Sequence, residues 1–212
     1  MKEIVQSDLF YCNHIGENEK DLRDIVDFTV RDEKGLGLLN YIQNNALEDE
    51  KLGLMRTYVV RDKRSSEMVG YFSLKSGLIS YNERDVIAVD GETGEEVYDK
   101  KTGEKLIHHV FDTFPGVELA NFAVNQKYID NHPNLKGIGF VIYKKLILPV
   151  IRKAAETIGI KILYLFALPY DDLISRYETY GFTRLAEKYE TELHNRLKPK
   201  YDSECKFMFR VL

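Results

Sequence analysis

One crossover unit constrains this chain more than any other feature: a strand, a glycine-opened helix and a second strand between residues 117 and 168. The stretch VELANFAV (117–124) is rich in apolar residues and is predicted to be a strand. Apolar residues then recur at helical spacing over 142–158, and KILYLFAL (161–168) is typical of a strand buried on both faces. Because a strand–helix–strand connection is a crossover, the two strands are predicted to be parallel neighbours.

Further segments extend this unit into an α+β (α/β) fold. RTYVVRD (56–62) and MVGYFSLKSGLI (68–79) are separated by a polar turn, which predicts an antiparallel hairpin, and CKFMFRVL (205–212) predicts a last strand. Apolar residues at helical spacing predict one helix over 19–31 and another over about 38–46.

The chain length and apolar content indicate one domain. With 212 residues, 44% of them hydrophobic, we expect a single domain over 1–212, with its core at 56–212. Residues of about 82–110 are expected to be an insertion. Within it Thr93-Gly94-Glu95 recurs as Thr102-Gly103-Glu104, a pattern that favours two adjacent hairpin turns.

Bulk properties exclude several classes of function. No apolar run is long enough to span a membrane and no export signal is evident, so we expect a cytoplasmic protein with Cys12 and Cys205 as reduced thiols. A net charge of −4 makes nucleic-acid binding unlikely and favours a cationic substrate. His108, His109 and His132 lack the spacing of metal ligands, so no metal is expected.

The stretch NLKGIGFVIY (134–143) has two glycines at the predicted start of the long helix. A helix N-terminus carries unpaired amides and partial positive charge, and glycine allows an anion such as pyrophosphate to approach the backbone. A dinucleotide fingerprint would need glycine at Ile142, and a P-loop would need Lys-Ser/Thr at Phe140-Val141. The alternative is that both glycines serve a turn or helix packing.

Two motifs in this order resemble the GCN5-related N-acetyltransferase (GNAT) family. NLKGIG (134–139) is similar to the family's Arg/Gln-x-x-Gly-x-Gly/Ala, and YETYGF (177–182) matches its Tyr-x-x-x-Gly-Phe. The chain departs from the family pattern at Asn134, at Tyr170, and in a longer loop over 124–137. The resemblance implies a single GNAT-like domain with a mixed, mostly antiparallel sheet, a central parallel strand pair and flanking helices.

The resemblance also implies acetyl-CoA as co-substrate. Its pyrophosphate would lie on the amides that open the helix, and its pantetheine arm would pair with the strand 117–124 where that strand separates from 161–168. The implied acetyl-CoA-binding residues are Phe122, Ala123, Val124, Lys136, Gly137, Ile138, Gly139 and Phe140.

Two residues match the family's proton-transfer positions. Glu118 would accept a proton from the amine, directly or through water, and Tyr177 would donate one to the departing thiolate. For Glu118 the alternative is an exposed residue near a strand end. For Tyr177 it is a core residue of an amphipathic helix, four positions after Leu173.

The acceptor is predicted less sharply. Residues 19–48, 82–110 and 186–204 are expected to surround it, and their Asp and Glu content favours a small cationic amine or an amine of a protein. A non-catalytic acyl-CoA-binding regulatory module is one alternative. A toxin-type relative that acetylates charged tRNA is another, for which Lys144, Lys145, Arg152 and Lys153 form a local basic cluster. A homodimer is also conceivable, since edge strands of this fold often pair.

Overall fold

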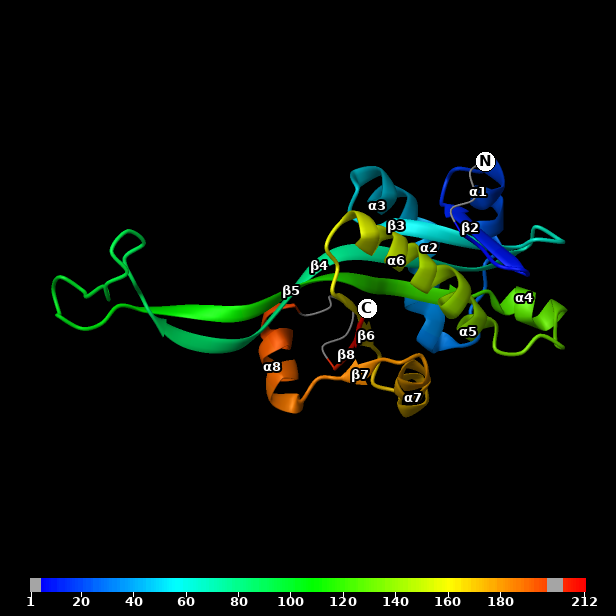
Figure 1. Ribbon diagram of the computed structural model, residues 1–212. Coiled ribbons are helices and arrows are strands. Elements are labelled where there is room, and N and C mark those ends of the chain that lie inside the picture. The colour runs from blue at the N-terminus through cyan, green and yellow to red at the C-terminus, as the bar shows by residue number, and fades with distance from the viewer. Residues whose placement is uncertain (1–4, 198–203) are drawn as a thin grey trace.

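The structure, a computed structural model, describes residues 5–197 and 204–212, and one eight-stranded sheet organises them (Figure 1). The strand order is β1-β2-β3-β4-β5-β6-β8-β7, and every neighbouring pair is antiparallel except β5 and β6. The strands are β1 (Val5–Gln6), β2 (Phe10–His14), β3 (Arg56–Asp62), β4 (Met68–Ile87), β5 (Ile107–Val124), β6 (Ile162–Ala167), β7 (Thr183–Arg184) and β8 (Lys206–Val211).

Helices cover both faces of the sheet. On one face Ile142, Leu146 and Ile151 bury against the central strands, and Tyr177 packs onto the same cluster. Helices α1 to α3 pack on the opposite face, and Leu193 of α8 packs onto a third cluster. The helices are α1 (Glu19–Val26), η1 (Glu33–Gly35), α2 (Leu36–Asn44), α3 (Ala46–Leu52), α4 (Gln126–Asn131), α5 (Ile138–Ile142), η2 (Tyr143–Ile147), α6 (Leu148–Thr157), α7 (Asp171–Thr179) and α8 (Glu187–Arg196).

The predicted fold class and the parallel pair are confirmed. Strands β5 and β6 pair in parallel, from Gly116 opposite Ile162 to Glu118 opposite Tyr164. Helices α5, η2 and α6 form the crossover between them as one continuous helical segment from Ile138 to Thr157. Its middle turn, η2, is π-helical and ends two residues before Pro149, whose ring and missing amide do not fit a regular α-helical ladder.

The first helix is shorter than predicted, because tertiary contacts redirect the chain after it. Helix α1 ends at Val26 rather than near residue 31. The Thr29 amide donates to Oδ1 of Asn125 at 3.1 Å, and the Gln126 amide donates to the Thr29 carbonyl at 3.0 Å. These bonds fasten the α1–α2 loop to the end of β5.

Several short elements were not predicted. Helix α4 forms inside the segment interpreted as a loop over 124–137, and α8 forms within 186–204. Strand β2 extends the sheet by pairing with β3. Six-residue helices and edge strands carry too few periodic positions for a pattern to be recognised. Residues 198–203 of the predicted acceptor segment lie outside the described residues.

The predicted insertion is part of a long two-stranded ribbon, here called the arm (residues 78–115), which projects from the body of the molecule (Figure 1). Its stem pairs 78–87 with 107–115, and its tip (88–106) holds two adjacent turns, as predicted. Oδ1 of Asp90 accepts two backbone amides in the first turn, and Oδ1 of Asp99 accepts two in the second.

Cys12 and Cys205 are both buried, and neither forms a disulfide with a described residue. Among the residues that the structure describes, no helix has the length and apolar character needed to cross a membrane.

Candidate functional site

The parallel strands separate immediately after their third residue pair. Backbone pairing of β5 with β6 ends at Glu118 and Tyr164, although β5 continues to Val124 and β6 to Ala167. A cavity of about 1040 Å³ lies alongside the separated part of β5, and Phe122, Ala123 and Val124 line it. The edge of β5 that faces β6 therefore has backbone groups free to pair with an extended ligand.

Tyr164 occupies the point at which the strands diverge. A Cβ atom added at Gly77 would overlap the Tyr164 hydroxyl, and one added at Gly116 would lie 3.1 Å from the ring. Glycine at both positions therefore makes room for Tyr164 across the sheet. The Tyr164 hydroxyl hydrogen-bonds to the Glu118 carboxylate.

The helix that opens with two glycines points its first amides at the same cavity. Gly137 is the N-cap, with φ of +67°, a left-handed conformation that glycine adopts without strain. The Val141 amide donates to the Gly137 carbonyl at 3.0 Å. Within the described residues, the amides from Lys136 to Phe140 donate to no protein acceptor. Together with the helix dipole they form a site suited to an anion.

The floor of this anion site is tightly packed. A Cβ atom added at Gly139 would lie 3.2 Å from the Tyr180 hydroxyl and 3.7 Å from Cγ2 of Val124. Tyr180 stacks on Tyr143, with ring centroids 4.8 Å apart, and also lines the cavity. The second glycine therefore serves close packing as well as anion access. Sequence reasoning missed Tyr180, although it lies within the YETYGF motif.

Tyr177 lies across the same cavity, on α7. Its half-buried ring makes edge contacts with Tyr180 and Phe182, at centroid distances of 6.0 and 5.7 Å. Burial raises the pKa of Tyr177 to about 12, so the phenol is protonated at neutral pH. Its hydroxyl has no hydrogen-bond partner in the part of the chain that the structure describes. The ring of Tyr177 thus packs against its aromatic neighbours, and Tyr177 also lines the cavity.

Glu118 is not among the residues that line the cavity. It lies at the vertex of the separated strands, where burial raises the pKa of its carboxyl group, while Lys75 and the hydrogen bond from Tyr164 lower it. Of the predicted residues, the structure thus groups Tyr177, Phe122–Val124 and the glycine segment around one cavity. Glu118 stands next to this group rather than within it.

The cavity rim carries mixed charge that sequence reasoning did not foresee. Nζ of Lys34 lies 3.9 Å from the centroid of the Tyr170 ring, so the α1–α2 loop contacts the β6–α7 loop. The sequence offered no signal for this, because the Thr29 contacts with Asn125 and Gln126 bring the α1–α2 loop to the rim. The charged lining residues are Arg31, Lys34, Lys136, Arg176, Asp32, Asp130 and Asp172.

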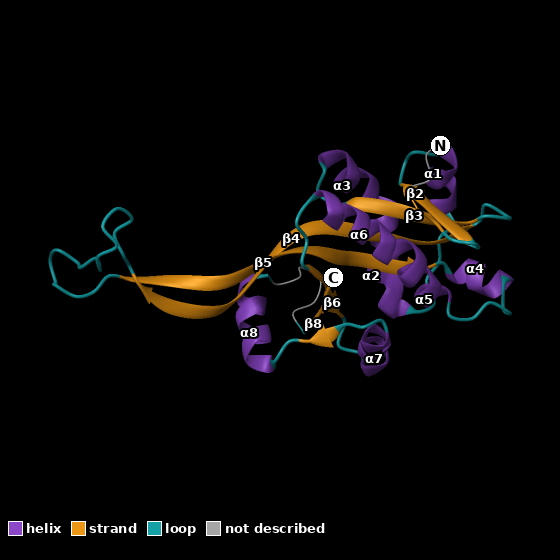
Figure 2. Ribbon diagram, in the orientation of Figure 1, coloured by secondary structure: helices purple, strands orange, loops and turns teal. Residues whose placement is uncertain are grey.

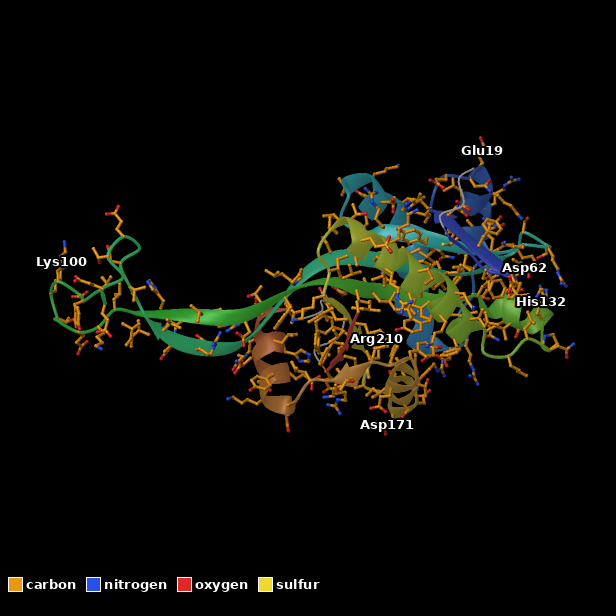
Figure 3. All side chains as sticks on the ribbon, in the orientation of Figure 1. Glu19, Asp62, Lys100, His132, Asp171 and Arg210 are labelled. Atoms are coloured by element: carbon orange, nitrogen blue, oxygen red, sulfur yellow. The ribbon has the colours of Figure 1, made fainter. Side chains whose placement is uncertain are left out.

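Two of the segments predicted to surround the acceptor do not contribute to this cavity. None of the residues of 82–110, and no described residue of 186–204, lines the cavity. Figure 3 shows Lys100 at the far end of the arm, remote from Asp171 at the start of α7. The acidity is also localised. The arm has nine Asp and Glu and four Lys and Arg, a charge of −5, and since the whole chain carries −4 the remainder carries +1.

Three carboxylates, Asp32, Asp130 and Asp172, line the cavity. Across residues 5–197 and 204–212, however, no group of three or more histidine, cysteine or carboxylate side chains is arranged to hold a metal ion.

No protein-family description matches the sequence, and no curated protein matches it. Solved structures do match its shape. A tyrosine-to-phenylalanine variant of the toxin AtaT has a TM-score of 0.59 and 15% identity, covering 100% of this chain and 94% of that one. A tyrosine-to-phenylalanine variant of KacT also matches, with a TM-score of 0.60 and 15% identity, covering 96% of this chain and 95% of that one. The chain has the GNAT fold.

The ligands of matching GNAT-fold structures concern the expectation that nucleic acid is an unlikely partner. AtaT in complex with acetyl-methionyl-tRNAfMet matches with a TM-score of 0.56 and 16% identity, covering 93% of both chains. Other matching structures are AtaTR bound with acetyl-CoA and a KacTA–DNA complex. The expectation that nucleic acid is unlikely finds no support here, and the localised acidity removes its main argument.

Proposed function

We propose that this protein is an N-acetyltransferase that moves the acetyl group of acetyl-CoA to a primary amine. The main support for this proposal is the run of unpaired backbone amides from Lys136 to Phe140, which opens onto the cavity beside the separated strands. Such amides are suited to a pyrophosphate. The matching AtaTR structure with bound acetyl-CoA supports this donor.

The pantetheine arm is proposed to run along β5. Beyond Glu118 this strand no longer pairs with β6, so the backbone of Phe122 and Val124 is available to the amides of the arm. In this arrangement the thioester lies near the vertex of the separated strands, within reach of Tyr177. The residues proposed to bind acetyl-CoA remain Phe122, Ala123, Val124, Lys136, Gly137, Ile138, Gly139 and Phe140.

The reaction is a direct transfer. The neutral amine nitrogen attacks the thioester carbonyl carbon, a C–N bond forms, and the C–S bond breaks. Tyr177 donates a proton to the departing thiolate, for which its protonated, unpartnered hydroxyl is suited. The proton lost by the amine passes to Glu118. Because Glu118 does not line the cavity, this transfer is proposed to run through water.

The chain offers a matched pair of tyrosines for testing this assignment. Tyr177→Phe is expected to leave acetyl-CoA affinity within about twofold and to lower turnover about 100-fold, the usual range for a lost acid. Tyr98→Phe, on the exposed arm, is the control and is expected to change neither. Calorimetry with CoA and a thiol-release assay measure the two quantities. Unchanged turnover in Tyr177→Phe would remove this residue from the mechanism.

The same assays separate the wider alternatives. Absence of CoA binding would overturn the transferase proposal. Tight CoA binding with no thiol release, over a panel of amines and aminoacyl-tRNA, would favour the non-catalytic regulatory module.

The α-amino group of an aminoacyl-tRNA is the second candidate acceptor, beside small or protein amines. AtaT bound to acetyl-methionyl-tRNAfMet favours it, as does the +1 charge outside the arm. Lys144, Lys145, Arg152 and Lys153 are exposed on the crossover helix, and none makes an ion pair with a described residue. This basic face is suited to phosphates.

Charge reversal at Lys145 and Arg152 distinguishes the two acceptor classes. For a tRNA acceptor, Lys145→Glu with Arg152→Glu is expected to raise KM for tRNA and to flatten its salt dependence, because phosphate contacts release counterions. Acetylation of a small amine and affinity for acetyl-CoA serve as internal controls and are expected to stay constant. Equal loss with both acceptors would contradict a tRNA-specific role for this face.

A further inference from the structure

Two glycines stand directly opposite each other on neighbouring strands, close to the vertex of the separated strands. Gly77 of β4 pairs with Gly116 of β5, where β4, β5 and β6 lie side by side in the sheet (Figure 2). Glycine inside a strand lowers stability and often marks a close approach by another group. That group is Tyr164 of β6, whose hydroxyl occupies the space of a Cβ atom at Gly77 and whose ring lies against Gly116.

The register places Tyr164 on the same face of the sheet as Glu118. These two residues form the last pair before β5 and β6 separate, and Lys75 of β4 pairs with Glu118 from its other side. Side chains that are paired across neighbouring strands project to the same face. The three side chains therefore form one row across β4, β5 and β6. The glycine pair shares this face, two residues farther from the cavity.

The Tyr164 ring is held in this position by aromatic neighbours. It is 3% exposed, and its centroid lies 6.2 Å from that of Phe166 and 5.7 Å from that of Phe207. Burial raises the pKa of Tyr164, so its phenol is protonated at neutral pH and donates to the Glu118 carboxylate. The glycine pair thus makes room for a buried hydrogen-bond donor beside the one carboxylate at the vertex.

We propose that Tyr164 is a positioning residue for the transfer reaction, because its hydroxyl holds the Glu118 carboxylate at the vertex in the ionised form that accepts a proton. This inference rests on the proposed function, in which Glu118 is the base. Burial raises the pKa of Glu118, while Lys75 and the Tyr164 hydroxyl lower it. Lys75 is exposed, so solvent screens its charge, whereas Tyr164 is buried. Helix α8 adds His194 to this face, with its ring 6.0 Å from that of Phe166.

The pH dependence of catalysis tests this role. Tyr164→Phe removes the hydroxyl and keeps the ring among its neighbours. Since the lost hydrogen bond favoured the ionised carboxylate, the acidic limb of kcat/KM should move up by about one pH unit, a loss of about tenfold below the limb. Turnover above the limb and affinity for CoA should stay within about twofold. Tyr58→Phe, a buried tyrosine stacked on Phe72 at 4.7 Å, is the control and should leave the limb in place. A merely structural role for Tyr164 would lower turnover equally at every pH, and that result would overturn the proposal.

Two further measurements separate this inference from the proposed function. In the Glu118→Gln background, Tyr164→Phe should have no pH-dependent effect, because Tyr164 acts through Glu118; a remaining pH-dependent effect contradicts the proposal. Carbon-13 NMR follows the Glu118 carboxyl without any need for activity, with its signal assigned by its absence in Glu118→Gln. The carboxyl pKa should rise by about one unit in Tyr164→Phe. If the wild-type protein releases no thiol, the transferase proposal fails, yet the titration still decides whether Tyr164 controls the ionisation of Glu118. An unchanged carboxyl pKa overturns the inference in either case.

Discussion

Replacing Gly137 by aspartate would put a negative charge where the pyrophosphate of acetyl-CoA is proposed to bind. Gly137 is the N-cap of the crossover helix, and a Cβ atom added there meets no other atom within 4 Å. Asn and Asp are the side chains that best tolerate its left-handed backbone. Gly137→Asn is therefore a nearly isosteric control, and the two variants differ only in charge.

The expected difference in binding can be worked from the geometry. A carboxylate about 5 Å from one phosphate charge is repelled by about 3 kcal/mol at an effective dielectric constant of about 20. Gly137 is exposed, so solvent and salt reduce this, and about 2–3 kcal/mol remains for both phosphates. Acetyl-CoA should therefore bind about 30- to 150-fold more weakly to Gly137→Asp than to Gly137→Asn.

Stability should change in the opposite direction. A carboxylate at a helix N-terminus adds about 0.3–1 kcal/mol to the free energy of unfolding through the helix dipole. Calorimetric titration with CoA and thermal denaturation of the apo variants measure the two effects. Equal CoA affinity of the Asp and Asn variants would refute the reasoning, because a pyrophosphate on these amides must sense the added charge.

The remaining predictions concern Arg61, Gly77 and Glu118, with the exposed Arg84 as a comparison for Arg61. Arg61→Met should lower the free energy of unfolding by about 3–5 kcal/mol in denaturant titrations. The substitution leaves the negative charge of a fully buried α1 carboxylate, the ion-pair partner of Arg61, without a counter-charge. Arg84→Met removes an exposed ion pair and should cost less than about 1 kcal/mol. Gly77→Ala should displace the Tyr164 ring and cost about 1–3 kcal/mol, so an unchanged melting temperature would contradict the packing described at the vertex. Burial raises the pKa of Glu118, and a base must be ionised to act. The plot of kcat/KM against pH should therefore have an acidic limb, on which kcat/KM falls as the pH decreases, at a pH above the usual pKa of glutamate. Glu118→Gln should abolish that limb, and a limb that persists would assign the base elsewhere.

The raised pKa of Glu118 has a matching effect on stability. Because the folded-state pKa lies above the unfolded one, the ionised side chain opposes folding at neutral pH, and this penalty disappears as the pH falls below the unfolded-state value. Glu118→Gln should therefore be relatively more stable at pH 7 than at pH 4, by comparison with the wild-type protein.

Much of the site was predictable because its signals are local. Apolar periodicity identified β5, the crossover helix and β6, and a strand–helix–strand crossover connection then predicted a parallel pair. Gly137 and Gly139 mark the helix start, since a left-handed N-cap favours glycine and the tightly packed first turn leaves little room for a side chain at Gly139. Tyr177 was predicted from its position in a motif, and it lines the cavity.

Other features depended on contacts between residues far apart in sequence. Helix α1 ends early because Thr29 bonds to Asn125, and the same contact brings Lys34 to the cavity rim. Tyr164 reaches Glu118 because Gly77, on another strand, leaves space for its ring.

Charge is the clearest case. Composition determined the net charge of −4. Only the extension of β4 and β5 into an arm places the excess of acidic residues away from the cavity. Periodicity, glycine positions and motif order are properties of neighbouring residues, so the sequence alone determined the elements and their parallel pairing. Which side chains meet at the cavity depends on packing between elements, and the tertiary structure alone decided it.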